Sequence, residues 1–200
     1  AMKVFDGGKE VTWAPTNADG RFSGQNITLK QAFAMSINSV AVRLGQECGI
    51  DRIAQTAHDM GIRSRLDATP ALALGSSDVT LKELVNAYCT PVNDGRHVAP
   101  VLVTKIEDRD GNIVYEAPHE EQEVLNPRAA FLVQQLLMGG MSGTSSRLHS
   151  YVGYGTDTDF GGKTGTSNNH SDAWFIGTTP RLVVGAWVGG EYRSIHFRTG

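Results

Sequence analysis

A lysine set among glycines and threonines near the end of the chain most strongly constrains the fold. The stretch runs from Gly161 to Thr166 and reads Gly-Gly-Lys-Thr-Gly-Thr. A polar, turn-like run follows it, and two apolar runs with the composition of strands come next, at about 172–178 and 181–189. These segments predict consecutive short strands, with the lysine on the first of them.

A phosphate-binding loop is the first alternative, because it also places a lysine after a glycine. The Walker pattern requires a glycine five positions before the Gly162-Lys163-Thr164 triplet, where this chain has Asp157. It also requires a helix directly after the lysine, since the amide groups at a helix N-terminus bind phosphate. The polar run after Thr166 predicts a loop instead. Both differences exclude a P-loop.

The composition is that of an ordinary globular protein. A chain of 200 residues fits one domain with a sizeable core. The net charge of −3 and the lack of a basic cluster argue against nucleic acid as a partner. No apolar run approaches the ~20 residues that span a bilayer. No signal peptide is evident, and Ala1-Met2 resembles a tag remnant.

Neither cysteines nor histidines have the spacing of a metal site, so no metal and no cofactor is expected. Cys48 and Cys89 lie in helical patterns, where buried free thiols are expected and a disulfide is the alternative. The 6 histidines, at positions 58, 97, 119, 149, 170 and 196, form no His-x-x-x-His or mixed Cys/His cluster.

Helices are predicted for the earlier part of the chain and strands for its end. Residues 3–27 are polar and are expected to be irregular. The further expected elements are a helical segment from Leu29 to about Gly45, a helix capped by Asp51 that ends at Gly61, a helix opened by the capping box of Thr80 and Glu83, a hairpin of 101–106 and 113–115 around Asp110-Gly111, a helix from Asn126-Pro127 to Met138, and strands at about 160–167, 172–178 and 181–189. Helices followed by consecutive strands imply an α+β domain with an antiparallel sheet.

Several short segments occur in an order that is typical of one family. They are Trp13-Ala14-Pro15-Thr16-Asn17, Ser36-Ile37-Asn38 within 34–42, Ala73-Leu74-Gly75 with Val79-Thr80-Leu81, Ala87-Tyr88 with Asn93-Asp94-Gly95, Lys163-Thr164-Gly165-Thr166, and 172–177 with Thr179-Pro180. Together they resemble the later part of the transpeptidase domain of class A penicillin-binding proteins, the bifunctional peptidoglycan synthases; Asp94 stands where that family often has glycine. Lys-Thr-Gly and Ser-x-Asn are two of the three motifs of serine enzymes that acylate on penicillin. The resemblance implies the α+β fold of penicillin-binding transpeptidases and serine β-lactamases, an antiparallel sheet flanked by helices.

The Ser-x-Asn pattern occurs twice, at Ser36–Asn38 and at Ser167–Asn169. The order of the motifs favours the first, because the second is the tail of the lysine strand. On a continuous helix the side chains of Ser36 and Asn38 would point ~200° apart. They can face one site only if the helix breaks there, with Asn38 or Ser39 capping the next segment. A plain helix interruption without function is the alternative.

The third motif, Ser-x-x-Lys, is absent from residues 1–200. In the family it precedes Ser-x-Asn, so here it would fall before residue 1, and a C-terminal helix would follow Gly200. The resemblance therefore implies a partial transpeptidase domain over 1–200 that is truncated at both ends. Such a fragment would lack the nucleophile and have no activity of its own.

The resemblance also implies a reaction for the parent protein. A serine outside this chain would attack the D-Ala-D-Ala bond of a peptidoglycan stem peptide, or a β-lactam, and the acyl group would pass to an amine of a neighbouring stem. Ser36, Asn38 and Lys163 would be catalytic. Thr164, Gly165 and Thr166 would bind the substrate, with the Thr166 N–H as half of the oxyanion hole.

The implied setting is extracytoplasmic, on the periplasmic face of the inner membrane. The parent would be anchored there through an upstream segment, carry a glycosyltransferase and act with other cell-wall synthesis proteins. A D,D-carboxypeptidase or β-lactamase-like hydrolase and a non-catalytic penicillin-binding scaffold remain the alternatives. Each residue also has a purely structural interpretation: Lys163 as an exposed strand lysine, Trp174 and Trp187 as packing, and Asp172 as a turn residue.

Overall fold

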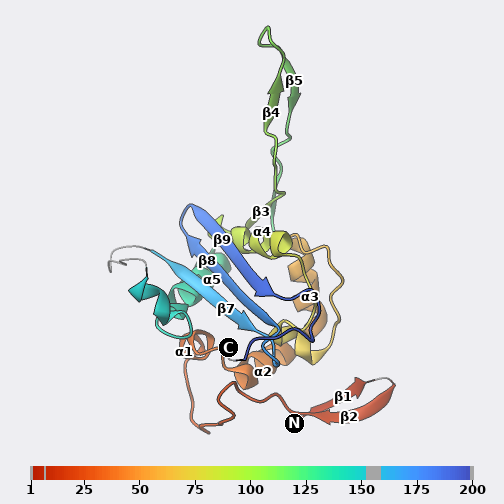
Figure 1. The fold of residues 1–200 in the computed structure, drawn as a ribbon, viewed down its shortest axis with the longest axis vertical. Helices are drawn as coiled ribbons and strands as arrows, with labels where there is room; N and C mark the ends of the chain where they lie inside the picture. The colour runs from red at the N-terminus through yellow and green to blue at the C-terminus, as the bar shows by residue number, and fades with distance from the viewer. Residues whose placement is uncertain (1, 7, 152–158, 199–200) are drawn as a thin grey trace.

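The fold joins a group of helices to a small antiparallel sheet at the end of the chain, as Figure 1 shows. The structure is a computed structural model and describes residues 2–6, 8–151 and 159–198. Its helices and strands are β1 (Met2–Asp6), β2 (Lys9–Trp13), α1 (Leu29–Ala34), α2 (Asn38–Cys48), α3 (Ile50–Asp59), η1 (Pro70–Leu74), α4 (Leu81–Val92), β3 (Arg96–Val98), β4 (Lys105–Glu107), β5 (Ile113–Glu116), β6 (Glu121–Glu123), α5 (Pro127–Gly140), η2 (Ser146–Ser150), β7 (Gly161–Thr166), β8 (Asp172–Thr179) and β9 (Leu182–Gly189). The α+β expectation is confirmed.

The lysine strand lies at one edge of the main sheet. This sheet has 3 strands in the order β7-β8-β9, and both pairings are antiparallel. Helix α5 packs on β7, and α4 packs on β9. Glycine permits the close approach of α5, because a Cβ at Gly161 would lie 2.9 Å from the backbone carbon of Leu137, and a Cβ at Gly140 would collide with the carbonyl oxygen of Gly162. The core beneath includes Leu137 and Ile176, which are almost fully buried.

The capping box that opens α4 is confirmed, and its carboxylate also holds a second segment. The Thr80 side chain accepts from the Glu83 N–H, and Glu83 accepts from the Thr80 N–H. One Glu83 oxygen accepts from the N–H groups of Arg63 (2.8 Å) and Ser64 (2.9 Å), and the other from the Ser64 hydroxyl (2.6 Å). These hydrogen bonds, that of the Ser64 hydroxyl above all, lower the pKa of Glu83 to about 2.

Three expectations are wrong. Residues 3–27 are not wholly irregular, because β1 and β2 pair as an antiparallel hairpin. Asp51 does not cap α3: Gly49 occupies the N-cap, and Asp51 lies in the first turn, where its charge complements the helix dipole. Cys48 is exposed rather than buried, because it ends α2 on the solvent side; Cys89 is half-buried, and both thiols are free.

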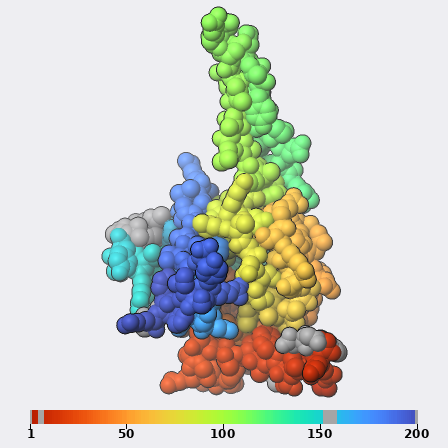
Figure 2. Space-filling view, turned by 45° about the vertical axis from the view of Figure 1, so that its right-hand side comes forward, coloured from red at the N-terminus to blue at the C-terminus, as the bar shows by residue number. Residues whose placement is uncertain are grey.

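The expected hairpin around Asp110-Gly111 projects from the body as a long arm, visible in Figure 1 and, in green, in Figure 2. Its strand β4 begins at Lys105 rather than at residue 101. At its base β3 pairs with β6, a pairing that the sequence pattern did not indicate. Apolar side chains of the arm are open to solvent, with Leu102 94% exposed and Val114 67% exposed.

Candidate functional site

The helical segment breaks at Ser36, as the Ser-x-Asn interpretation requires. Helix α1 ends at Ala34 and α2 begins at Asn38. Between them Ser36 adopts a φ of 53°, in the left-handed region that few residues other than glycine occupy. The Ile37 N–H then donates to the carbonyl of Ala32 (2.9 Å), which closes the turn. The Ser36 side chain therefore does not point in the direction that a continuous helix would give it.

The cap of α2 comes from elsewhere, so the expectation of Asn38 or Ser39 as the cap is wrong. Ile37 occupies the N-cap and contributes no side-chain hydrogen bond. Instead the Ser39 N–H donates to the side-chain oxygen of Asn17 (3.1 Å), and the Asn38 side-chain amide donates to the carbonyl of Thr16 (2.8 Å). The Trp13–Asn17 segment therefore fixes both the start of α2 and the orientation of Asn38.

Lys163 meets Ser36 although 127 positions separate them in the chain. The ammonium of Lys163 donates to the Ser36 hydroxyl (2.8 Å) and to the carbonyl of Thr164 (2.9 Å). The ammonium also lies 5.8 Å from the centre of the Phe33 ring. Burial lowers the pKa of Lys163 below its ordinary value. It is therefore not an ordinary exposed strand lysine.

A second contact joins β7 to the segment after α5. The Thr164 hydroxyl donates to the Thr144 hydroxyl (2.8 Å), and the Thr144 N–H donates to the carbonyl of Ala34 (3.0 Å). Sequence reasoning missed Thr144, because the glycine- and serine-rich region from Gly139 to Gly162 has no period that would assign it to an element.

Gly165 and Thr166 complete the outer half of β7. Gly165 lies opposite Trp174 in the sheet, and Thr166 lies exposed at the end of the strand, opposite Ala173. Among the described residues, no hydrogen bond joins Asn38 or Thr166 to Lys163. The structure thus links Ser36, Lys163 and Thr164 directly, while Asn38 and Thr166 flank this group.

Asp172 does more than form a turn. Its carboxylate accepts from the indole N–H of Trp187 (3.0 Å) and from the Ser171 hydroxyl (2.9 Å), and these hydrogen bonds, that of Trp187 first, lower the pKa of Asp172. The rings of Trp174 and Trp187 lie 6.4 Å apart, which confirms that they pack on each other across β8 and β9. This network orders the loop that follows β7.

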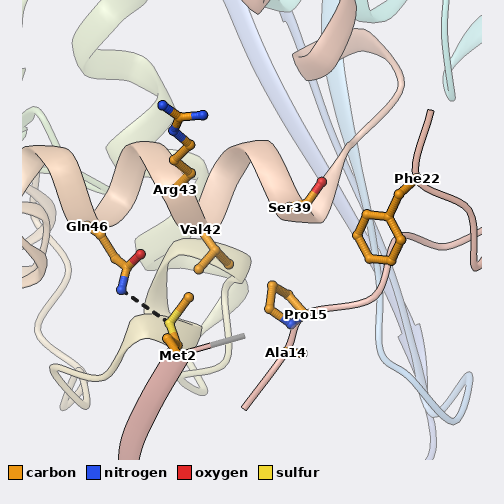
Figure 3. Close-up of a pocket in the computed structure, with 8 residues that line it drawn as sticks. All are labelled: Met2, Ala14, Pro15, Phe22, Ser39, Val42, Arg43 and Gln46. Atoms are coloured by element: carbon orange, nitrogen blue, oxygen red, sulfur yellow. Dashed lines mark hydrogen bonds between the residues drawn. The ribbon is translucent and has the colours of Figure 1, made fainter. Parts of the chain in front are cut away.

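A cavity of about 180 Å³ lies elsewhere, between β1, the Trp13–Asn17 segment and α2. Figure 3 shows Pro15 and Val42 lining it, with Gln46 reaching the sulfur of Met2. None of the residues that line it belongs to the Lys163 group.

In the described ranges no group of three or more His, Cys, Asp or Glu side chains is placed to bind a metal, and no helix there is long and apolar enough to cross a bilayer.

Chemically, the group is a hydroxyl held against a half-buried ammonium. Because burial lowers the pKa of Lys163, the ammonium gives up a proton more readily than a solvated lysine does. The hydroxyl of Ser36 can accept that proton while it passes its own proton to a third atom. Ser36 and Lys163 together can therefore relay a proton beside the open edge of β7.

Comparison with known proteins assigns the chain to a family. Residues 3–188 match the family described as penicillin binding protein transpeptidase domain. The chain is 33% identical over 190 residues to penicillin-binding protein 2D of Bacillus subtilis, covering 93% of this chain and 27% of that protein. It is 33% identical over 183 residues to penicillin-binding protein 1A of Neisseria gonorrhoeae, covering 88% of this chain and 22% of that protein. The chain thus spans only about a quarter of these relatives' lengths.

Solved structures show the same fold. The crystal structure of penicillin-binding protein 1A from Haemophilus influenzae superposes with a TM-score of 0.87 at 25% identity, covering all of this chain and 35% of that chain. The imipenem acyl-enzyme complex of penicillin-binding protein A from M. tuberculosis gives a TM-score of 0.73 at 22% identity, over 92% of this chain and 46% of that chain. The latter likeness bears on the fold alone.

Proposed function

Because the chain belongs to the family of penicillin-binding protein transpeptidase domains, we propose that it is part of a D,D-transpeptidase whose nucleophilic serine lies in another part of the protein. In this proposal residues 1–200 form a partial domain without activity of its own. The observation that carries the proposal is the hydrogen bond of 2.8 Å between the Lys163 ammonium and the Ser36 hydroxyl. It joins the two motifs, distant in sequence, that a penicillin-acylating serine enzyme needs at one place.

The acylation step is a displacement at the carbonyl between the two terminal D-alanines of a stem peptide. The serine oxygen forms a bond to the carbonyl carbon, and the bond to the leaving D-alanine nitrogen breaks. The lysine of the Ser-x-x-Lys motif takes the proton of the attacking serine, and Ser36 relays a proton to the leaving nitrogen, while Lys163 keeps its charge beside Ser36. An amine of a neighbouring stem then attacks the ester, the serine leaves with a proton, and a cross-link remains.

The edge of β7 binds the substrate in the extended form. The Lys163 charge attracts the terminal carboxylate, and the hydroxyls of Thr164 and Thr166 hydrogen-bond it. Gly165 keeps the strand surface open for a peptide or a β-lactam. The Thr166 N–H supplies one donor of the oxyanion hole, a contribution of about 3 kcal/mol to the transition state. Asn38, held by the carbonyl of Thr16, binds the substrate amide and the lysine of the absent motif.

The whole protein acts outside the cytoplasm, since cross-linking of peptidoglycan takes place there. We propose that its other parts include a glycosyltransferase, a membrane anchor and surfaces for cell-wall synthesis partners.

The test is intact-mass detection of a benzylpenicillin adduct. We expect one adduct on the full-length protein, at a serine outside residues 1–200, and none on the 200-residue chain. Lys163→Ala in the full-length protein removes the adduct, whereas Lys105→Ala, at a lysine of the projecting arm, retains it. An adduct on the short chain, or none on the full-length protein, contradicts the proposal.

A second readout separates transfer from hydrolysis. Incubation of the full-length protein with lipid-linked peptidoglycan precursors should give cross-linked muropeptides. Release of D-alanine without cross-links would assign the protein to the carboxypeptidases.

A further inference from the structure

We propose that Thr144 is a positioning residue of the acylation site, which holds the Thr164 hydroxyl in place to bind the carboxylate of the substrate. This inference rests on the proposed function of the β7 edge and extends it to a residue outside the three family motifs. Thr144 belongs to the segment between α5 and η2, which lies between the end of α1 and β7.

The main chain of this segment is fixed against the end of α1, just before the Ser36 turn. The Thr144 N–H donates to the carbonyl of Ala34, two residues before Ser36. Gly143 lies so close that a Cβ there would collide with the same carbonyl oxygen. Since both contacts are to one backbone group, the position of Thr144 follows that of the Ser36 turn.

The side chain of Thr144 reaches the other half of the site. Its hydroxyl lies 2.8 Å from the Thr164 hydroxyl, and Thr164 also accepts from the Lys163 ammonium through its carbonyl. Thr144 therefore ties together the two elements whose separation sets the contact of Lys163 with Ser36.

The hydroxyl pair has the right protons to serve a carboxylate. In the free site Thr164 donates to Thr144. A hydroxyl proton rotates freely, so when a carboxylate accepts from Thr164, Thr144 can turn to donate to the Thr164 oxygen. A donor chain of this kind strengthens each of its hydrogen bonds. Without the Thr144 hydroxyl, the Thr164 side chain loses both its fixed rotamer and this support.

The experiment measures benzylpenicillin acylation of the full-length protein as a function of penicillin concentration. Thr144→Val keeps the shape and the N–H but removes the hydroxyl. We expect the half-saturating concentration to rise about tenfold, because the loss of one hydrogen bond to a charged group weakens binding by about this factor. The maximal acylation rate should change little. Thr144→Ser should retain most of the affinity, and Thr12→Val, at an exposed strand threonine of β2, serves as the matched control.

A double-mutant cycle with Thr164→Val separates positioning from general structure. If Thr144 acts through Thr164, the double variant loses no more affinity than Thr164→Val alone. Multiplied losses, or an unchanged half-saturating concentration in Thr144→Val, overturn the inference. If Thr144→Val lowers Tm more than Thr12→Val does, Thr144→Ala takes its place in the cycle. Absence of any adduct on the unsubstituted full-length protein would instead refute the proposed function.

Discussion

The lysine strand β7 and the projecting hairpin of β4 and β5 are both antiparallel ribbons, but they are held in different ways. Helix α5 packs on β7, and β7 also contacts the Ser36 turn and the Thr144 segment. The arm is held by its own strand pairing and by the hydrogen bonds of its turn, and its apolar side chains Leu102 and Val114 face solvent. An isolated two-stranded hairpin is marginally stable in water. We infer that global stability and the geometry of the site depend on the body, and that the arm folds as a local unit.

Glycine positions provide the strongest test of this difference. Gly140→Ala places a Cβ against the carbonyl oxygen of Gly162, so α5 must move away from β7. We expect a loss of about 3 kcal/mol in the free energy of unfolding, at the upper end of overpacking effects. Urea unfolding followed by circular dichroism measures it.

Gly111→Ala, at the turn of the arm, is the matched control. A Cβ there meets nothing within 4 Å, and only the φ of 84° opposes it. We expect a local cost of about 1 kcal/mol that leaves the main urea transition in place. Equal losses in both variants would mean that the arm and the body unfold as one unit.

Replacement of a carboxylate should likewise lower the free energy of unfolding in the body but not in the arm. Glu83→Gln weakens the hydrogen bonds that join α4 to Arg63 and Ser64, at a cost of about 2 kcal/mol. Because the folded-state pKa of Glu83 lies at about 2, below its ordinary 4.5, this contribution is complete above pH 4.5. It disappears as the pH falls through about 2. The difference between the protein and Glu83→Gln should therefore shrink between pH 5 and pH 2.

Asp108→Asn tests the corresponding group in the arm, where hydrogen bonds with Asn112 lower the pKa of the carboxyl. We expect no change in the main unfolding transition at any pH in this range. A pH-dependent shift as large as that of Glu83→Gln would contradict the independence of the arm.

Replacement of Lys163 should have a smaller effect on the free energy of unfolding, and should raise it rather than lower it. Lys163→Met should stabilise the protein by about 1 kcal/mol, because burial disfavours the charged form, as the lowered pKa indicates. The penalty on the charged form is complete below the lowered folded-state pKa and disappears as the pH rises from there to the ordinary pKa of 10.5, so the gain should fade in alkali. Thermal unfolding at neutral and alkaline pH measures both. Lys105→Met, on the arm, should change nothing; destabilisation by Lys163→Met would show that its contacts with Ser36 and Thr164 outweigh its desolvation.

Removal of the arm should have the smallest effect. Val98 pairs with Glu121 at the base, so a short turn can replace residues 101–118. We expect a change of less than about 0.5 kcal/mol in the free energy of unfolding, the range of ordinary surface substitutions. Loss of cooperative unfolding in this variant would show that the base of the arm is part of the core.

Local signals made much of this body predictable from the sequence. The Thr80–Glu83 capping box, the proline that opens α5 and the three closing strands each have a pattern within a few residues. The break at Ser36 was predicted only through the resemblance to the family's Ser-x-Asn motif, since two side chains ~200° apart on a continuous helix cannot face one site.

Other features depend on residues far away in the sequence, so the local sequence pattern did not predict them. At the start of α2 the Ser39 N–H donates to the side chain of Asn17, 22 positions earlier in the chain, and the local pattern therefore predicted Asn38 or Ser39 instead. Thr144 contacts Thr164 and Ala34, and neither contact creates a period in the sequence. The arm lacked its base in the prediction because β3 and β6 contain only 3 residues each.

The left-handed backbone of Ser36 limits which substitutions evolution can accept at this position. At a φ of 53° a glycine would relax the main chain by about 1 kcal/mol, and the same single change would delete the hydroxyl that Lys163 touches. A glycine with an easier backbone and retention of the proposed proton relay therefore exclude each other at this one position. A descendant with glycine there is expected to have kept the fold and given up the chemistry.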